Sequence, residues 1–278
     1  LKLKIYLRQI NARPEYAKAG IQELYDEGAN FLTRHARMNV FEHEDSKSNP
    51  FYEQDRRQLN TTNNLRASRT LFHFLQANGD NRYQALYKEA SAGGYKAMAQ
   101  GNHNASNQEL APESVSVVEV LPTDPVYFIS KSESFFMQAE VAVRMGLGDA
   151  EALYNQGVMA AFEKFGMDGS DFIADGGNYD FPQDGSDEEK MKAIMTQKWV
   201  GLARFQGMEA WNEWKRTGIP EVNQGGYNAA DYEPGQFVSP VSNSLGENKF
   251  PLRVYFPDSE RSRNENTPEL VNITQPVW

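Results

Sequence analysis

The clearest hydrophobic pattern in this sequence lies between residues 129 and 165 and predicts two consecutive helices. In its first half, apolar and small residues recur at steps of three and four, the spacing that keeps side chains on one face of an α-helix. The residues on this face are Ile129, Ser132, Phe136, Ala139 and Val143. A second stripe with the same spacing follows and comprises Tyr154, Val158, Ala161, Phe162 and Phe165. Small residues beside this stripe allow the two helices to pack closely.

The link between these two helices is short. Gly146 and Gly148 lack a Cβ, which suits the end of a helix, so at least one of them should have a positive φ. Asp149 can accept a hydrogen bond from the first free N–H groups of the next helix. A short link makes the helices antiparallel, and a helical pair within about 35 residues is typical of tetratricopeptide repeats.

Two further regions have helical periodicity. An opening helix ends before Pro14, and a second helix is expected from Pro14 to about Arg34, so residues 1–34 should form another helical hairpin. A single long helix is expected over residues 187–217, with acidic residues at its start. Its apolar line includes Trp199 and Trp211, which we therefore expect to pack in the core.

Long stretches without helical periodicity separate these helices. Residues 38–64, 91–124 and 167–189 are polar or rich in turn-forming residues, apart from a β-like run at 115–120. Residues 221–278 carry no amphipathic helix and should wrap over the helices as ordered loop. The pattern predicts an all-α fold of tetratricopeptide-like hairpins with long irregular loops, and such loops often carry function.

Four stretches of the sequence resemble one known family. They are NGDNR at 78–82, ISKSESFFMQAEVAVRMG followed by ALYNQGVMAAFEKFG within residues 129–166, IMTQKWVGLARFQGMEAWNEWKRTGIP at 194–220, and FPLRVYFPDSERSRN at 250–264. On these residues the chain resembles the SusD/RagB family of outer-membrane nutrient-binding lipoproteins, in particular its SusD-like branch. The resemblance covers most of the chain and implies a single SusD-like domain over residues 1–278.

The resemblance also implies a function. It is the non-catalytic capture of a glycan, or of a peptide, at the outer face of a bacterial outer membrane, as the lid subunit of a SusC-type TonB-dependent transporter. The implied partners are an oligosaccharide or polysaccharide and that transporter, and the implied localisation is that of a surface-exposed lipoprotein. Because the sequence opens within an amphipathic helix at Leu1, we expect a preceding N-terminal portion that carries the lipidated cysteine and part of the binding face.

Composition and charge restrict the function further. A net charge of −10 over 278 residues disfavours binding to nucleic acid or to an anionic membrane surface, since phosphates attract clustered Lys and Arg. No run approaches the ~18 consecutive apolar residues that span a bilayer. Membrane association is therefore expected only through a lipid anchor outside this sequence. The absence of Cys excludes disulfides, thiol catalysis and thiolate metal sites in these residues.

The sequence shows no catalytic motif and no motif for a cofactor or metal. It has no G-x-S-x-G, H-E-x-x-H, Walker or dinucleotide-binding motif, and its four histidines match no metal-ligand spacing. Neighbouring carboxylates such as Glu188 and Glu189 point in different directions on a helix and cannot flank one glycosidic bond. An acidic loop could supply oxygen ligands to Ca²⁺, but its spacing fails the EF-hand pattern, which favours a solvated loop. Its acidic residues are Asp168, Asp171, Asp175, Asp180, Asp184 and Asp187.

Aromatic residues of the irregular segments are the candidates for ligand binding. A ring held on irregular backbone can stack on a pyranose while neighbouring amides and carboxylates bind its hydroxyls. We therefore expect ligand contacts from residues 91–124 and 221–250 rather than from helix faces. The candidates are Tyr95, Asn102, His103, Tyr227, Tyr232, Glu233 and Phe237. The alternative is a helical-repeat adaptor that binds another protein and no sugar, whereas a hydrolase would need a catalytic pair that is not found.

Overall fold

The structure is a computed structural model that describes the whole chain except residues 61–63, 227, 241–242, 247 and 278. The regular structure of its described residues is almost entirely helical, with one π-helical segment, Glu53–Gln58, and two short strands, β1 (Ala36–Met38) and β2 (Val126–Ile129). The predicted all-α class is therefore confirmed. The α-helices are α1 (Lys2–Gln9), α2 (Pro14–Asp26), α3 (Pro50–Tyr52), α4 (Arg69–Ala77), α5 (Tyr83–Leu86), α6 (Lys131–Met145), α7 (Ala150–Glu163), α8 (Ser170–Ile173), α9 (Asp187–Leu202), α10 (Gly207–Thr217) and α11 (Asp258–Arg263).

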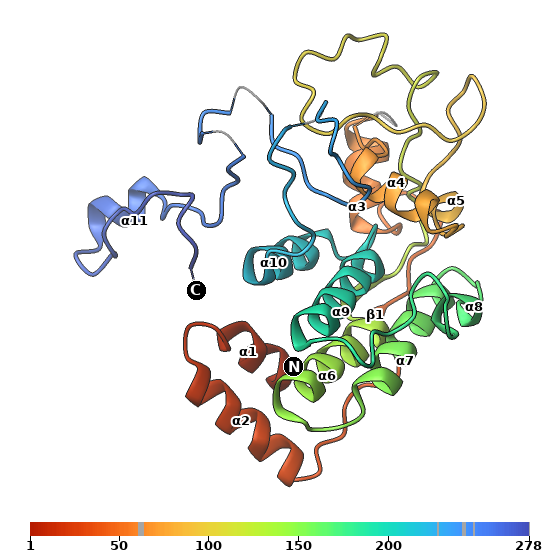
Figure 1. The fold of residues 1–278 in the computed structure, drawn as a ribbon. Helices are drawn as coiled ribbons and strands as arrows, with labels where there is room; N and C mark the ends of the chain where they lie inside the picture. Colours follow the sequence, from red (N-terminus) through yellow and green to blue (C-terminus); the bar gives the residue numbers. More distant parts are fainter. Residues whose placement is uncertain (61–63, 227, 241–242, 247, 278) are drawn as a thin grey trace.

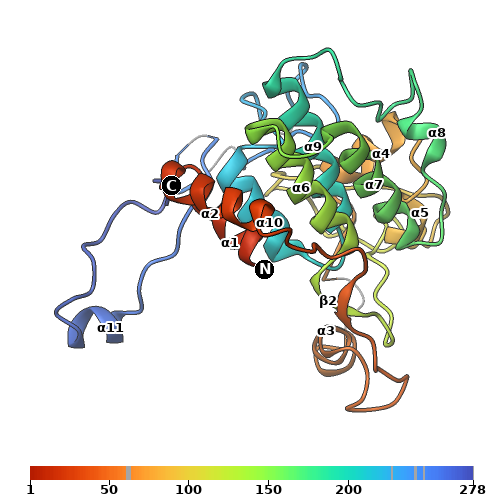
Figure 2. The same cartoon turned by 90° about the horizontal axis from the view of Figure 1, so that it is seen from below.

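The body of the molecule is built around three packed helices. Helices α6, α7 and α9 contact one another, and α1 joins α6 from the side opposite to α4 and α5 (Figure 1). Seen from below, α1, α2 and α10 lie on one side of α6, while α7 and α8 lie on the other (Figure 2). The strands β1 and β2 pair antiparallel next to α6 and form the small sheet.

The hairpin predicted over residues 129–165 is present as α6 and α7. Ser130 begins α6 with a capping box, in which its side chain accepts from the backbone N–H of Glu133. Gly146 has a φ of 69° and Gly148 a φ of 113°, which confirms the predicted turn. Asp149 caps α7 by accepting a hydrogen bond from the N–H of Ala152. The two stripes are buried except at their ends, where Val143 and Phe165 are only partly buried.

The N-terminal hairpin is also present, but its second helix is shorter than expected. Apolar residues of α1 and α2, such as Leu7 and Ile21, pack against Val141 of α6 in one core cluster. Helix α2 ends at Asp26 and not near Arg34, because Gly28 adopts a φ of 66° and the following N–H, of Ala29, donates to the Leu24 carbonyl. The prediction of a helix over 14–34 is therefore wrong in its last third.

The long helix expected over 187–217 is in fact two helices, α9 and α10. The chain leaves the helical conformation at Ala203, and Arg204 has a positive φ of 69°. This turn lets the Arg204 guanidinium reach Asp124, whose two carboxylate oxygens both lie 2.7 Å from Nη2. Nη1 also donates to the Ala85 carbonyl at 3.0 Å. The break is thus stabilised by contacts with residues far away in the sequence.

The break changes the environment of the tryptophans. Trp214 is buried with 6% of its surface exposed, as expected for a core residue. Trp199 packs against the cluster that contains Phe72 and Val200, but its ring is only partly buried. Trp211 is also partly buried. The expectation of core packing therefore holds only in part for Trp199 and Trp211, because part of each ring remains exposed.

Several segments that were expected to be irregular contain short regular elements. Residues 50–58 form α3 and the π-helical segment. The Asn49 side chain caps the N-terminus of α3 by accepting hydrogen bonds from the N–H groups of Phe51 and Tyr52. The β-like run at 115–120 makes only isolated bridges, from Val117 to Arg66 and from Val118 to Tyr87. It is therefore not a strand of a sheet.

The C-terminal segment covers the helices over only part of its length. Phe237 and Phe250 pack on Trp214, and Val238 is buried at 2% exposure. Beyond Phe250, residues 251–277 form an arm with α11 that projects away from the body (Figures 1 and 2), and most of them are exposed. The expected wrap over residues 221–278 is therefore wrong for the arm.

Candidate functional site

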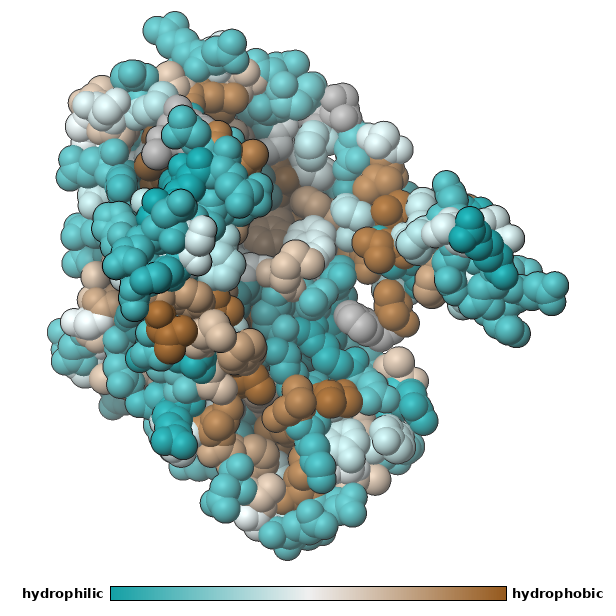
Figure 3. Space-filling view, turned by 180° about the vertical axis from the view of Figure 1, so that it is seen from behind, coloured by the Kyte–Doolittle hydropathy of each residue, from teal (hydrophilic) through white to brown (hydrophobic). Residues whose placement is uncertain are grey.

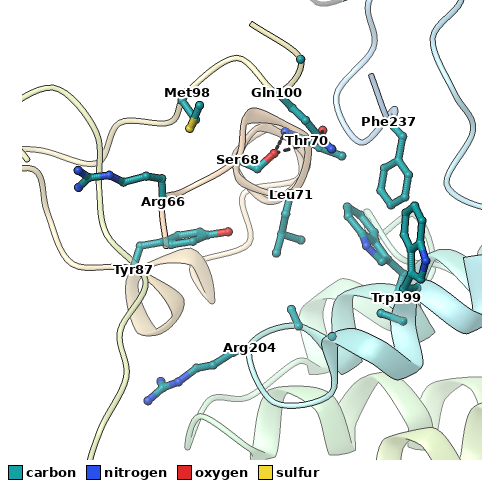
Figure 4. A pocket seen from close by; sticks show the side chains of 15 residues that line it. Arg66, Ser68, Thr70, Leu71, Tyr87, Met98, Gln100, Trp199, Arg204 and Phe237 are labelled. Atoms are coloured by element: carbon teal, nitrogen blue, oxygen red, sulfur yellow. Dashed lines mark hydrogen bonds between the residues drawn. The ribbon is translucent and has the colours of Figure 1, made fainter. Parts of the chain in front are cut away.

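A pocket of about 490 Å³ lies between the start of α4, the loop near Gln100 and the break between α9 and α10. Its volume is within the ~300–1,000 Å³ that is usual for ligand sites. On the face seen from behind, hydrophobic residues gather in a hollow between the body and the projecting arm (Figure 3). The close view shows Trp199 and Phe237 on one side of the pocket, Ser68, Thr70 and Gln100 grouped next to Phe237, and Tyr87 across from the rings (Figure 4).

The aromatic wall consists of three rings from three elements. Trp199 comes from α9, Trp211 from α10 and Phe237 from the C-terminal segment. Trp199 meets Phe237 edge to face at 6.0 Å, and Trp211 stacks on the buried Trp214 at 4.7 Å. The indole N–H of Trp214 donates to the Pro220 carbonyl at 2.9 Å. These contacts hold the rings in place, so the wall is preformed.

The polar wall consists of Ser68, Thr70 and Gln100. Ser68 caps α4, and its Oγ lies 3.2 Å from the Gln100 Oε1. Thr70 Oγ1 lies 2.7 Å from the same oxygen and 3.1 Å from the Gln236 carbonyl, so its one proton is donated to one of them. The NH₂ group of Gln100 has no hydrogen-bond partner within the part of the chain that the structure describes. It can therefore donate to a ligand.

Two arginines line this pocket, but neither guanidinium is directed at the aromatic wall. The Arg204 guanidinium is held by Asp124 and the Ala85 carbonyl, and the Arg66 guanidinium points away from the aromatic wall (Figure 4). Burial raises the pKa of Tyr87 well above its usual range, so its hydroxyl stays protonated. Rings, hydroxyls and an amide are therefore available to a ligand, and a fixed counter-charge is not.

A larger pocket of about 640 Å³ lies on the other side of Arg204. Its lining is mainly apolar, with Phe51, Val118 and Met208 among its residues. The polar groups that reach it are engaged, because Asn49 caps α3 and Asp124 pairs with Arg204. It therefore offers few groups that could orient a polar ligand.

Of the predicted site residues that the structure describes, only Phe237 lies in the wall of the first pocket. Tyr95 meets Tyr83 edge on at 5.1 Å and packs against a core cluster. Asn102 and His103 follow Gly101, which lines the pocket, but neither lines it.

The remaining candidates lie in the C-terminal segment. Tyr232 lies under the Arg69 guanidinium, at 4.2 Å from its ring centroid, and Glu233 lines a small neighbouring pocket. Tyr227 lies outside the described residues. The expectation that these loop residues form the site remains a prediction.

The residues that sequence reasoning missed are Trp199, Trp211, Ser68, Thr70 and Gln100. One signal was available for the two tryptophans. At 3.6 residues per turn, two side chains twelve positions apart on a straight helix point in directions that differ by about 120°. Trp199 and Trp211 could therefore not both face one core on an unbroken helix. The polar residues carry no comparable signal, because their convergence depends on the fold.

Among the described residues there is no group of three His, Cys, Asp or Glu side chains that could hold a metal ion. In the acidic loop, Asp168 and Asp180 instead accept hydrogen bonds from the backbone N–H groups of Ser170 and Gly176. Within the described ranges, no helix combines the length and apolar character of a bilayer-spanning segment.

The fold and the pocket define an all-α protein of helical hairpins with an aromatic-walled ligand pocket. Over residues 1–240 the chain matches the model of the SusD-like family, which is described as starch-binding and associating with the outer membrane. This match covers most of the chain, so the chain belongs to the SusD-like family. The resemblance found in its sequence is thereby confirmed.

Solved structures of SusD homologues share the fold. One from Bacteroides uniformis is 23% identical with a TM-score of 0.76, and the alignment covers 100% of this chain and 62% of that one. A chitin-binding homologue from Flavobacterium johnsoniae is 20% identical with a TM-score of 0.73, over 96% of this chain and 57% of that one. This chain thus spans about three-fifths of their length, and at these identities the similarity concerns the fold. A comparison with curated protein sequences finds no match.

Proposed function

We propose that this protein binds a neutral glycan, without catalysis, in the pocket between α4 and the α9–α10 break. One observation carries this proposal: the rings of Trp199, Trp211 and Phe237 line the same pocket as the neutral hydrogen-bonding groups of Ser68, Thr70 and Gln100. A pyranose presents an apolar face that stacks on aromatic rings and hydroxyls that bind amides and other hydroxyls. A neutral sugar needs no counter-charge, and the pocket offers none.

The composition of the pocket favours binding over hydrolysis. Most glycoside hydrolases use two carboxyl groups that flank the scissile bond. None of the described residues that line this pocket is Asp, Glu or His. The nearest carboxylate across Arg204, that of Asp124, is already held by the guanidinium.

We further propose that the protein acts at the cell surface as a lipid-anchored partner of a SusC-type TonB-dependent transporter. The family description, which names starch binding and the outer membrane, supports this role. The exposed side chains of Val254, Tyr255 and Phe256 on the arm are suited to a protein partner. The same residues favour the alternative function, a protein adaptor without sugar binding, and a glycan-binding experiment separates the two.

A glycan array followed by calorimetry tests the proposed site. We expect a dissociation constant between micromolar and millimolar, or about −4 to −8 kcal/mol, because an open pocket with few anchors binds weakly. Trp211→Ala removes one ring of the wall and should weaken binding at least tenfold. Phe128→Ala is the matched control, since it removes a ring that is 63% exposed and does not line the pocket.

Three results would contradict the proposal. Equal affinities of Trp211→Ala and Phe128→Ala would place the glycan elsewhere, and Tyr95→Ala and Tyr232→Ala would then test the loop candidates. Release of reducing ends during incubation would contradict the non-catalytic function. No binding to any glycan of the array would favour the protein adaptor.

A further inference from the structure

The larger pocket of about 640 Å³, which we call the apolar pocket, adjoins the first pocket. The two pockets share the lining residues Arg204 and Gly207. Leu65 lines the apolar pocket, and its neighbour in the chain, Arg66, lines the first pocket. Each volume is within the ~300–1,000 Å³ that is usual for ligand sites. The two pockets are therefore close enough for one elongated ligand to enter both.

The edge that the two pockets share is open at Gly207. This residue is the first of α10, and it is exposed. A Cβ at position 207 would meet no atom of the described residues within 4 Å. The other shared residue, Arg204, is fixed, since its guanidinium is held by Asp124 and the Ala85 carbonyl. There is thus room at Gly207 for a ligand group that connects the two pockets.

The two pockets offer different groups to a ligand. The first pocket has the hydroxyls and the amide of its polar wall, whereas most side chains of the apolar pocket are aliphatic or aromatic. These are Phe51, Leu65, Val118, Val120, Val126, Phe205 and Met208. The Asn49 amide at its wall is engaged, because its Oδ1 caps α3 and its Nδ2 donates to the Asp124 carbonyl at 2.8 Å. A sugar hydroxyl would lose its bonds to water there without replacement, whereas an apolar group would be stabilised.

The lining of the apolar pocket can be reached from solvent. Phe51 is 50% exposed and Met208 is 75% exposed, and both belong to the lining. They come from α3 and from the start of α10, respectively. The pocket is therefore an accessible apolar surface beside the first pocket and not a sealed gap in the core.

We propose that the two pockets form one site for an amphiphilic glycan, that is, a neutral sugar that carries an apolar substituent such as an acyl or alkyl chain. The sugar ring lies against Trp199 or Trp211 in the first pocket, and its substituent crosses the shared edge at Gly207 and is buried in the apolar pocket. This inference rests on the proposed function of the first pocket and narrows the class of its ligand.

Calorimetry with simple glycosides tests this site. The probes are the methyl, n-butyl and n-octyl β-glycosides of D-glucose, D-galactose and D-mannose, used below the concentrations at which they form micelles. The control without a sugar is n-octanol. Because each buried CH₂ group strengthens binding by up to roughly fourfold, the best octyl glycoside should bind at least about tenfold more tightly than its methyl counterpart.

Four variants locate the two parts of the ligand. Phe51→Ala removes a ring of the apolar pocket, and Gly207→Leu fills the shared edge at a position whose φ is not positive. Both should lower the ratio of octyl to methyl affinity severalfold. Phe128→Ala, which removes an exposed ring that lines neither pocket, is the matched control and should keep the ratio of the parent. Trp211→Ala should weaken the binding of both kinds of glycoside, since Trp211 lines only the first pocket.

Three results would overturn the proposal. The first is that no octyl glycoside binds the parent protein more tightly than its methyl counterpart. The second is that Phe51→Ala and Gly207→Leu both keep the affinity ratio of the parent. The third is that n-octanol binds as tightly as the octyl glycosides, which would make the apolar pocket a site for apolar groups alone, such as those of a protein partner.

Failure of the proposed function gives a different result. In that case Trp211→Ala would bind the glycosides as tightly as the parent protein, and this inference would fail with it. If Trp211→Ala weakens the binding of the methyl glycosides but the octyl chain adds no affinity, the first pocket remains a glycan site and only the amphiphilic ligand is wrong.

Discussion

His35 is a residue whose protonation state is set by its surroundings. Its Nδ1 accepts a hydrogen bond from the backbone N–H of Lys131, at 3.0 Å, and this bond requires an unprotonated Nδ1. Burial, followed by the charges of Lys164 and Arg37, lowers the pKa of His35 to about 4. From the sequence, His35 matches no metal-ligand spacing. Its hydrogen-bond partner, the backbone N–H of Lys131, is 96 residues away and could be identified only from the fold.

Stability should therefore fall as the pH decreases from about 6.5, the usual pKa of histidine, towards 4. In this window the unfolded chain binds a proton that the folded state binds less well, so protonation favours unfolding. His35→Asn keeps an acceptor close to the position of Nδ1 and does not titrate. Its denaturant midpoint should change less with pH than that of the parent.

The exposed His43 provides the control for this experiment. His43→Asn should keep the pH dependence of the parent protein. If His35→Asn shows the same slope as the parent and the control, another group causes the loss of stability in this pH range.

At the scale of elements, the α6–α7 hairpin depends on one close approach between the helices. Phe136 is fully buried, and its ring occupies the space in front of Gly157. A Cβ at position 157 would lie 2.6 Å from the nearest ring atom, which is closer than a real Cβ contact. The sequence pattern predicted both helices, their turn and their facing stripes, because all of these are local features.

Gly157→Ala should destabilise the protein by about 1–3 kcal/mol through overpacking, although Ala favours a helix by about 1 kcal/mol over Gly. Phe136→Ala should cost about 3–5 kcal/mol because it leaves a cavity. In the Phe136→Ala background the clash is gone, so adding Gly157→Ala should be neutral or stabilising. Denaturant unfolding of the four proteins measures this coupling.

Gly201 of α9 offers a matched control, since a Cβ there would make only an ordinary 3.4 Å contact. Gly201→Ala should be tolerated. If Gly157→Ala costs the same stability with and without the Phe136 ring, the close approach is not the cause.

The break between α9 and α10 shows why other elements were mispredicted. Most of the apolar line of residues 187–217 is compatible with one helix, and within that stretch only the offset of about 120° between Trp199 and Trp211 argues against it. The turn at Arg204 is instead stabilised by Asp124 and Ala85, which are 80 and 119 residues away along the chain. Local periodicity cannot detect a helix end that depends on such distant contacts.

At the scale of the whole molecule, the pocket exists only because four separate segments meet. They contribute Ser68 and Thr70, then Gln100, then the two tryptophans, and finally Phe237. Composition and motifs were sufficient to predict the family and the all-α class, because these follow from the chain as a whole. Only one residue of the pocket, Phe237, was among the candidates chosen from the sequence. The sequence does not show which of the aromatic residues in loops come together in the fold.

The most direct test of the proposed function is a crystal structure of the protein with the oligosaccharide that binds it best. We expect an intact glycan with one sugar ring stacked against Trp199 or Trp211 and a hydroxyl bound by Gln100. A glycan bound over Tyr95 or Tyr232, with the pocket between α4 and α10 left empty, would contradict it.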